Sequence, residues 1–101
     1  MKPLVSIIMN CKNGEKYLEE SIESVINQTY ENWELIFVDN ASNDNSKSIF
    51  FSFKDHRLKY FFLENGVNLG TARQIALKNC SGDFISFLDT DDIWFNEKLE
   101  K

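Results

Sequence analysis

Three carboxylates fall within four positions of this sequence, at Asp89, Asp91 and Asp92. They directly follow the apolar run 84–88, which has the composition of a buried strand. Because like charges this close repel one another and are costly to bury alone, the group needs water, a cation or a base beside it. A divalent metal, which prefers oxygen ligands, is one solution. A solvated turn with a helix N-cap is the other, since Asp suits both positions.

The composition indicates one globular domain in a reducing compartment. The chain has 101 residues, of which 43% are hydrophobic, enough for a real core. A formal charge of −5 argues against nucleic acid or an anionic membrane surface as the partner. Cys11 and Cys80 form no CxxC motif, and the apolar run near the N-terminus is too short for a signal peptide or a membrane span.

Short apolar runs alternate with segments of helical periodicity. We expect strands at 4–9, 33–39, 58–63 and 84–88, and helices within 16–28, 40–55 and 68–83. Asn13 is expected to cap the first helix, and Gly82 to stop the last one. Crossovers of roughly 20 residues between strands suit right-handed βαβ units, so the predicted class is α/β with a parallel sheet.

In a parallel sheet all strands end at the same edge. The segments 10–14, 39–44 and 89–92 follow the first, second and fourth predicted strands, so we expect them to lie close together. Ligands of α/β proteins bind at this carboxyl edge. The position therefore favours a functional role for Asp89, Asp91 and Asp92 over a solvated turn, and Asp39 lies at the same edge.

The segments 5–44, 68–77 and 82–92, taken in this order and spacing, resemble the nucleotide-binding half of inverting family 2 glycosyltransferases. The resemblance implies a Rossmann-like GT-A fold, with a parallel sheet of about four strands in the order 3-2-1-4 flanked by helices. It implies that residues 1–101 form the nucleotide-sugar-binding part, with the acceptor half absent. The family transfers a sugar from a nucleotide diphosphate sugar, usually a UDP-sugar, to a glycan or lipid-linked acceptor in polysaccharide biosynthesis. A cytoplasmic location is implied, at the inner face of the membrane for a longer protein.

The resemblance also implies a metal site. The family's Asp-x-Asp motif corresponds to Asp89-Thr90-Asp91, which would hold Mg²⁺ or Mn²⁺ on the diphosphate. Asp91 is the implied metal ligand, and Asp89 contributes to the same site and lies towards the ribose.

Four further residues match nucleotide-binding positions of the family. Asp39 corresponds to the acid that accepts a hydrogen bond from the uracil NH, a role that suits a group offering only acceptors. Arg73 would lie near the nucleotide, where a guanidinium can meet phosphate or base edges. Cys11 and Asn13 would line the base pocket.

The chain departs from the family pattern at several positions. Asn10 and Lys12 stand where the family commonly has a proline and a stacking aromatic residue, and Asn40 and Ala41 stand where it often has Asp and Gly. The identity of the base is therefore left open. An inverting transferase needs a general base. No residue of this chain matches it, so we expect the fragment to bind the donor without turnover.

The pattern leaves other functions open. A phosphatase of the haloacid dehalogenase type also uses an Asp-x-Asp motif, but after its first strand. A receiver-like domain would need paired acids after that strand, where this chain has Asn10-Cys11. A nucleotide-binding or assembly module without catalysis fits as well. We also expect a homodimer through an exposed edge of the fourth strand, near Phe84, Phe87, Trp94 and Phe95.

Overall fold

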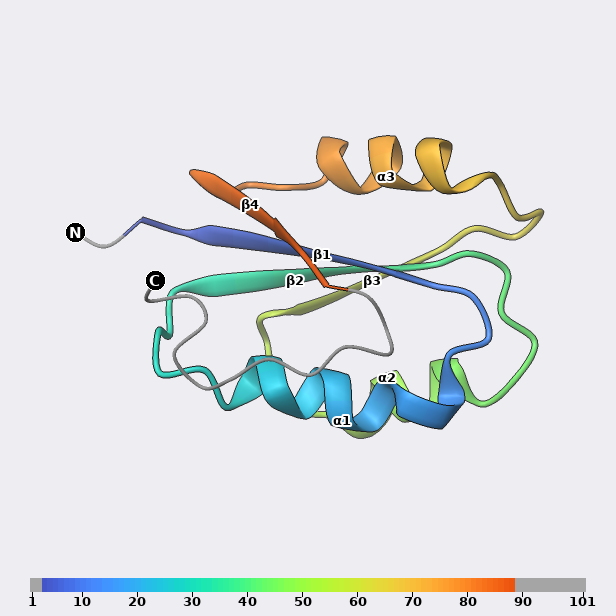
Figure 1. Ribbon diagram of the computed structural model, residues 1–101, viewed down its shortest axis with the longest axis horizontal. Coiled ribbons are helices and arrows are strands. Elements are labelled where there is room, and N and C mark those ends of the chain that lie inside the picture. Colours follow the sequence, from blue (N-terminus) through green and yellow to red (C-terminus); the bar gives the residue numbers. More distant parts are fainter. Residues whose placement is uncertain (1–2, 89–101) are drawn as a thin grey trace.

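The computed structural model describes residues 3–88, which form a single parallel sheet covered by helices. The elements are β1 (Val5–Cys11), α1 (Glu15–Ile26), β2 (Trp33–Asp39), α2 (Ser46–Ser52), β3 (Leu58–Phe62), α3 (Leu69–Lys78) and β4 (Phe84–Phe87). The strand order is β3-β2-β1-β4, and every neighbouring pair is parallel (Figure 1). The α/β class and the strand order are thus confirmed. Asp89, Asp91, Asp92, Trp94 and Phe95 lie outside the described residues.

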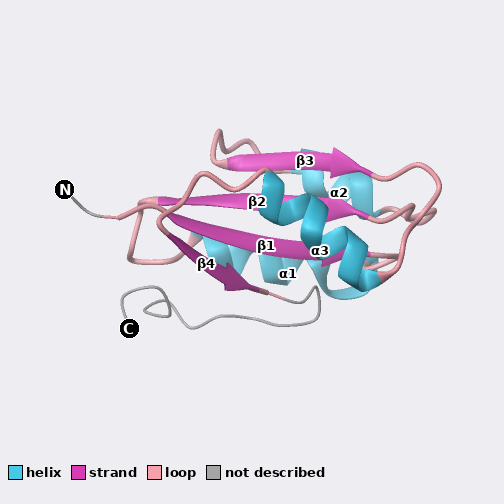
Figure 2. Ribbon diagram, turned by 90° about the horizontal axis from the view of Figure 1, so that it is seen from above, coloured by secondary structure: helices cyan, strands magenta, loops and turns pink. Residues whose placement is uncertain are grey.

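Helices cover both faces of the sheet. Helices α1 and α2 lie on one face and α3 lies on the other (Figures 1 and 2). Because side chains alternate along a strand, Phe37 packs in the cluster under α1 and α2, whereas Ile36 and Val38 pack under α3. This arrangement explains why all seven residues of β2 are buried. No helix in 3–88 is both long and apolar enough to cross a membrane.

The first helix is amphipathic, but its N-terminus is capped differently from the prediction. The N-cap is Gly14, which makes no side-chain capping bond, so the assignment of Asn13 as the cap was wrong. Asn13 has a φ of 54°, and its Oδ1 accepts a hydrogen bond from the backbone N of Asn43. A side chain from the next loop supplies the cap, because Oδ2 of Asp44 accepts from the N of Glu15 at 3.1 Å.

Gly82 does not stop the last helix, which ends at Lys78 with Asn79 as the C-cap. A Cβ atom at Gly82 would lie 2.5 Å from Oγ of Ser6 and 2.8 Å from the carbonyl oxygen of Leu4. The glycine is therefore needed because the loop before β4 passes directly against β1.

A buried carboxylate ties this loop to the sheet. Glu34 accepts hydrogen bonds from Oγ of Ser6 at 2.6 Å, from the N of Ser81 at 2.6 Å and from Nζ of Lys59 at 2.7 Å. Burial raises the pKa of the Glu34 carboxyl, but the bonds from Lys59, Ser6 and Ser81 outweigh burial and leave the pKa below its usual value. The network fixes the start of β4, the strand that leads to Asp89.

Strand β4 is at the edge of the sheet described here. It pairs with β1, and three of its side chains are exposed, namely Phe84, Ile85 and Phe87. Exposed apolar side chains on an edge strand favour association with another surface. A homodimer through this edge stays a prediction.

Candidate functional site at the carboxyl edge of the sheet

The carboxyl ends of the two central strands lie side by side. Cys11 of β1 is in register with Asp39 of β2, and the N of Asn40 donates to the carbonyl oxygen of Cys11 at 2.7 Å. Helices α1 and α3 begin at this same edge (Figure 1). The positive ends of two helix dipoles therefore point to the edge, where they favour an anion.

Hydrogen bonds join the loops after β1 and β2 into one unit. The N of Asn13 donates to Oγ of Ser42 at 2.8 Å, and the N of Gly14 donates to Oγ of Ser46 at 3.0 Å. Beneath these loops, Cys11 is 1% exposed, and its Sγ lies 3.9 Å from Oγ of Ser42. Burial raises the pKa of the Cys11 thiol, so Cys11 is a packed neutral group under the site.

Asp39 is fully buried at the end of β2, and each carboxylate oxygen has a partner. Oδ2 accepts from the hydroxyl of Tyr60 at 2.5 Å, and Oδ1 accepts from the N of Ser42 at 3.0 Å. Burial and the Asp39 carboxylate both raise the pKa of Tyr60, so the hydroxyl stays protonated and donates. A carboxylate offers about four acceptor positions, and these two bonds leave some of them for a further donor.

Two hydrogen bonds of one side chain join the loop after β2 to the loop after β3. The side-chain amide of Asn40 donates to the carbonyl oxygen of Val67 at 2.6 Å and accepts from its N at 2.8 Å. Ala41 has a φ of 58° and packs near Gly66, whose φ is 68°. Sequence reasoning treated Asn40 only as a departure from the family and missed this role, as it missed that of Tyr60. Neither contact could be predicted from the local sequence, because a single Tyr in a strand or an Asn in a loop does not indicate a distant partner.

Arg73 lies apart from the group formed by Cys11, Asn13 and Asp39. Arg73 is exposed on α3, with its guanidinium 5.6 Å from the centre of the Phe87 ring. It lies on the α3 face, whereas the Asp39 side chain lies on the α1 and α2 face with Tyr60. The structure therefore brings Cys11, Asn13 and Asp39 together through the loops, and places Arg73 on the other side of the sheet.

The expected metal ligands, Asp89 and Asp91, lie outside the described residues. Within 3–88 no group of three or more His, Cys, Asp or Glu side chains could hold a metal ion. Asp39 belongs to no such group, and its bonded partners are the hydroxyl of Tyr60 and the backbone N–H of Ser42. Leu88, the last described residue, is 2% exposed and donates its N–H to the carbonyl oxygen of Ile8 at 2.9 Å. The residue before Asp89 is thus fixed against β1, at the edge where a diphosphate site is expected.

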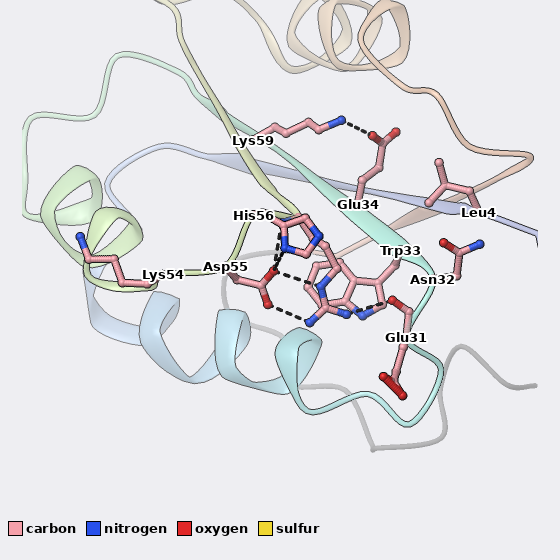
Figure 3. A pocket seen from close by; sticks show the side chains of 10 residues that line it. Leu4, Glu31, Asn32, Trp33, Glu34, Lys54, Asp55, His56 and Lys59 are labelled. Carbon is pink, nitrogen blue, oxygen red and sulfur yellow. Dashed lines mark hydrogen bonds and ion pairs between the residues drawn. The ribbon is translucent and has the colours of Figure 1, made fainter.

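A pocket of about 740 Å³ lies at the opposite, amino edge of the sheet (Figure 3). Its charged side chains largely pair with one another: Arg57 bonds Asp55 at 2.7 Å and stacks 3.8 Å from the Trp33 ring centre, and Lys59 bonds Glu34. The side chain of His56 is 93% exposed here. This pocket is separate from the carboxyl edge.

Comparisons with known proteins agree with this architecture. The family model described as Glycosyl transferase family 2 matches residues 6–101. The chain is 48% identical, over 97 residues, to the Escherichia coli protein named UDP-Glc:alpha-D-GlcNAc-diphosphoundecaprenol beta-1,3-glucosyltransferase WfgD, covering 96% of this chain and 38% of that protein. It is 33% identical to the crystal structure of S. aureus TarS 1-349 in complex with UDP-GlcNAc, with a TM-score of 0.91, covering 99% of this chain and 29% of that one.

A third match shows the fold alone. The mannosyltransferase PcManGT from Pyrobaculum calidifontis, in complex with GDP-Man and Mn²⁺, is 24% identical with a TM-score of 0.85, covering 93% of this chain and 29% of that one. The chain spans about two fifths of the length of the first curated relatives that it matches. Its fold is that of GT-A glycosyltransferases, and the chain belongs to glycosyl transferase family 2.

Proposed function

We propose that this chain binds a nucleotide diphosphate sugar, specifically a UDP-sugar, at the carboxyl edge of its sheet, for metal-dependent transfer of the sugar with inversion. The observation that carries the proposal is the buried Asp39 carboxylate, held at that edge beside the joined loops after β1 and β2. Its support from relatives is that WfgD is named for UDP-Glc and that TarS is seen with UDP-GlcNAc.

Asp39 recognises the base in this proposal. The imino NH of uracil is a donor, and a carboxylate with acceptor positions left can receive it. The bonds from Tyr60 and Ser42 fix the direction of the carboxylate, so a base would meet an acceptor that is already oriented. Asn13 and Cys11, whose neighbour Ser42 also bonds Asp39, line the base pocket in this proposal.

Asp89 and Asp91 hold Mg²⁺ or Mn²⁺ in this proposal. The chain carries a net charge of −5, so its own carboxylates would repel a diphosphate without a cation between them. A bound divalent cation neutralises the charge that develops on the leaving diphosphate. The bond from the N–H of Leu88 to Ile8 supports this role, because it holds the residue that precedes the Asp-x-Asp motif in the sequence against β1. Arg73 would add a positive charge from α3.

The acceptor is a glycan or a lipid-linked sugar, as in polysaccharide biosynthesis. The name of WfgD, which includes a diphosphoundecaprenol-linked acceptor, supports this class. We assign the general base to no residue of this chain. A cytoplasmic location, at the inner face of the membrane, belongs to the same proposal and suits the free thiols of Cys11 and Cys80.

The proposed base recognition is tested by comparing UDP with CDP. Cytosine has an acceptor where uracil has its imino NH, so it would face the Asp39 carboxylate with an unpaired acceptor. We expect UDP to bind about tenfold more tightly than CDP in Mn²⁺, by calorimetry. Asp39→Ala should remove this preference. Equal binding of UDP and CDP to the unchanged chain would contradict the assignment.

Family membership speaks against the phosphatase and receiver-like alternatives.

A further inference from the structure

Asn10 carries a buried polar atom whose partner is not found in the described part of the chain. It is the second-last residue of β1 and is in register with Val38 of β2. Its side chain is half-buried, while its Oδ1 is fully buried and makes no hydrogen bond with any group in 3–88. Buried acceptors without a partner are rare in native proteins and indicate a bound water, ion or ligand.

Asn10 lies near the carboxyl edge, beyond the last residue of β1 that pairs with β4. Strand β4 pairs with β1 only as far as Ile8, which is in register with Phe87. Beyond Ile8 the described part of the chain provides β1 with one strand neighbour, β2. By the alternation of side chains, Asn10 lies on the face of Ile8, the α3 face, which also carries Arg73 above Phe87. Asn10 therefore lies at the end of β1 that meets the carboxyl edge, on the face of the sheet that α3 covers.

Asn40, at the same edge of the sheet, has a side-chain amide with a structural role. Both polar atoms of Asn40 bond to the backbone of Val67. Oδ1 of Asn10 makes no such bond among residues 3–88, and Ile8 and Val38, which neighbour Asn10 in the sheet, are apolar. A buried amide oxygen without a partner points to a bound donor group.

We propose that Oδ1 of Asn10 accepts a hydrogen bond from a hydroxyl of the bound nucleotide sugar, so that Asn10 helps to determine which donor is used. This inference rests on the proposed function. Chemistry limits which group of the ligand can be the partner of Oδ1. Phosphates offer acceptors only, so they cannot donate a hydrogen bond to it. The base NH is assigned to Asp39, whose side chain lies on the other face of the sheet. In UDP-glucose, the hydroxyls of the ribose and of the sugar are the donors that remain.

The experiment compares Asn10→Ala with Asn27→Ala, a matched change at the exposed C-cap of α1, where that helix ends at the amino edge. Calorimetry with UDP and with UDP-glucose, each in Mn²⁺, measures affinity, and thermal unfolding measures stability without ligand. We expect Asn10→Ala to lose about tenfold in affinity, which equals about 1.4 kcal/mol. Its midpoint of unfolding should be unchanged or higher, because no bond within the protein is lost. Asn27→Ala should bind as the unchanged chain does.

The two ligands separate the two sources of the hydroxyl. Equal losses for UDP and UDP-glucose assign the hydroxyl to the ribose, and a loss for UDP-glucose alone assigns it to the sugar; either supports the proposal. Unchanged affinity for both ligands overturns it while leaving the proposed function intact. A midpoint of unfolding several degrees lower for Asn10→Ala than for Asn27→Ala also overturns it, because Asn10 would then have a structural partner. If the unchanged chain binds neither ligand, the proposed function fails and this inference fails with it.

Discussion

The hydroxyl of Tyr60 donates to Oδ2 of Asp39 across a distance of 2.5 Å, joining the middle of β3 to the carboxyl end of β2. The ring of Tyr60 stacks against Phe37 with centroids 5.7 Å apart, and Phe37 stacks in turn against Phe50 of α2. The proposed base-reading carboxylate is therefore held by an aromatic cluster in the core. Its position depends on packing as much as on the loop that follows it.

Tyr60→Phe tests the strength of this link. The substitution keeps the ring contacts and removes one hydrogen bond to a buried carboxylate, so we expect a loss of about 1.5–3 kcal/mol in the free energy of unfolding. Chemical denaturation measures it. Tyr17→Phe, on the exposed side of α1, is the matched control and should change stability by less than about 0.5 kcal/mol. Equal stability of the two variants would show that the bond contributes nothing.

Ala41→Gly should stabilise the chain. Ala41 holds a φ of 58°, a conformation that costs an L-residue about 1 kcal/mol and costs glycine almost nothing. Allowing for the added freedom of glycine in the unfolded chain, we expect a gain of about 0.5 kcal/mol. The opposite substitution, Gly66→Ala, should destabilise by about 0.5 kcal/mol. Its φ is 68°, its new Cβ would meet only ordinary contacts, and the same entropy offset applies. Shifts of the same sign in both variants would refute this reasoning.

The Glu34 network should make stability sensitive to acid. The pKa of Glu34 is lower in the folded chain than its usual value of 4.5, so its contribution is fully present above that value. The contribution is lost as the pH falls through the lowered pKa, when the carboxylate that accepts from Ser6, Lys59 and Ser81 is protonated. Unfolding followed from pH 7 to pH 2 should show a smaller acid-induced loss for Glu34→Gln than for the exposed control Glu23→Gln. Parallel pH profiles for the two variants would rule out this role.

The sequence predicted the strands well because their signal is local. An apolar run that ends at an acid marked β2 at Trp33–Asp39, and the structure has the same bounds. The order of the strands followed from the family resemblance. These features depend on hydrophobic pattern and on the lengths of the crossovers, both of which can be read along the chain.

The failures involve contacts between residues far apart in the sequence. Asn13 has the residue type of an N-cap, but Asp44 caps α1 from the next loop. Gly82 has the residue type of a helix stop, but its small size serves close packing on Ser6. The bond from Tyr60 to Asp39 belongs to the same class, since 21 positions separate the two residues. Residue type alone cannot report which distant backbone or side chain will be its partner.

We propose that Asp91 serves the metal and Asp39 serves the base. This assignment is tested by titrating UDP into the unchanged chain, Asp91→Asn and Asp39→Ala, each in Mn²⁺ and in EDTA. In this account Asp91 is a metal ligand, whereas Asp39, bonded to Tyr60 and Ser42, serves the base. We predict that UDP binds the unchanged chain at least about tenfold more weakly in EDTA, and that Asp91→Asn loses most of this metal effect with an unchanged circular dichroism spectrum. Asp39→Ala should bind UDP more weakly and keep the metal effect. Equal affinity of the unchanged chain for UDP in Mn²⁺ and in EDTA would contradict the account.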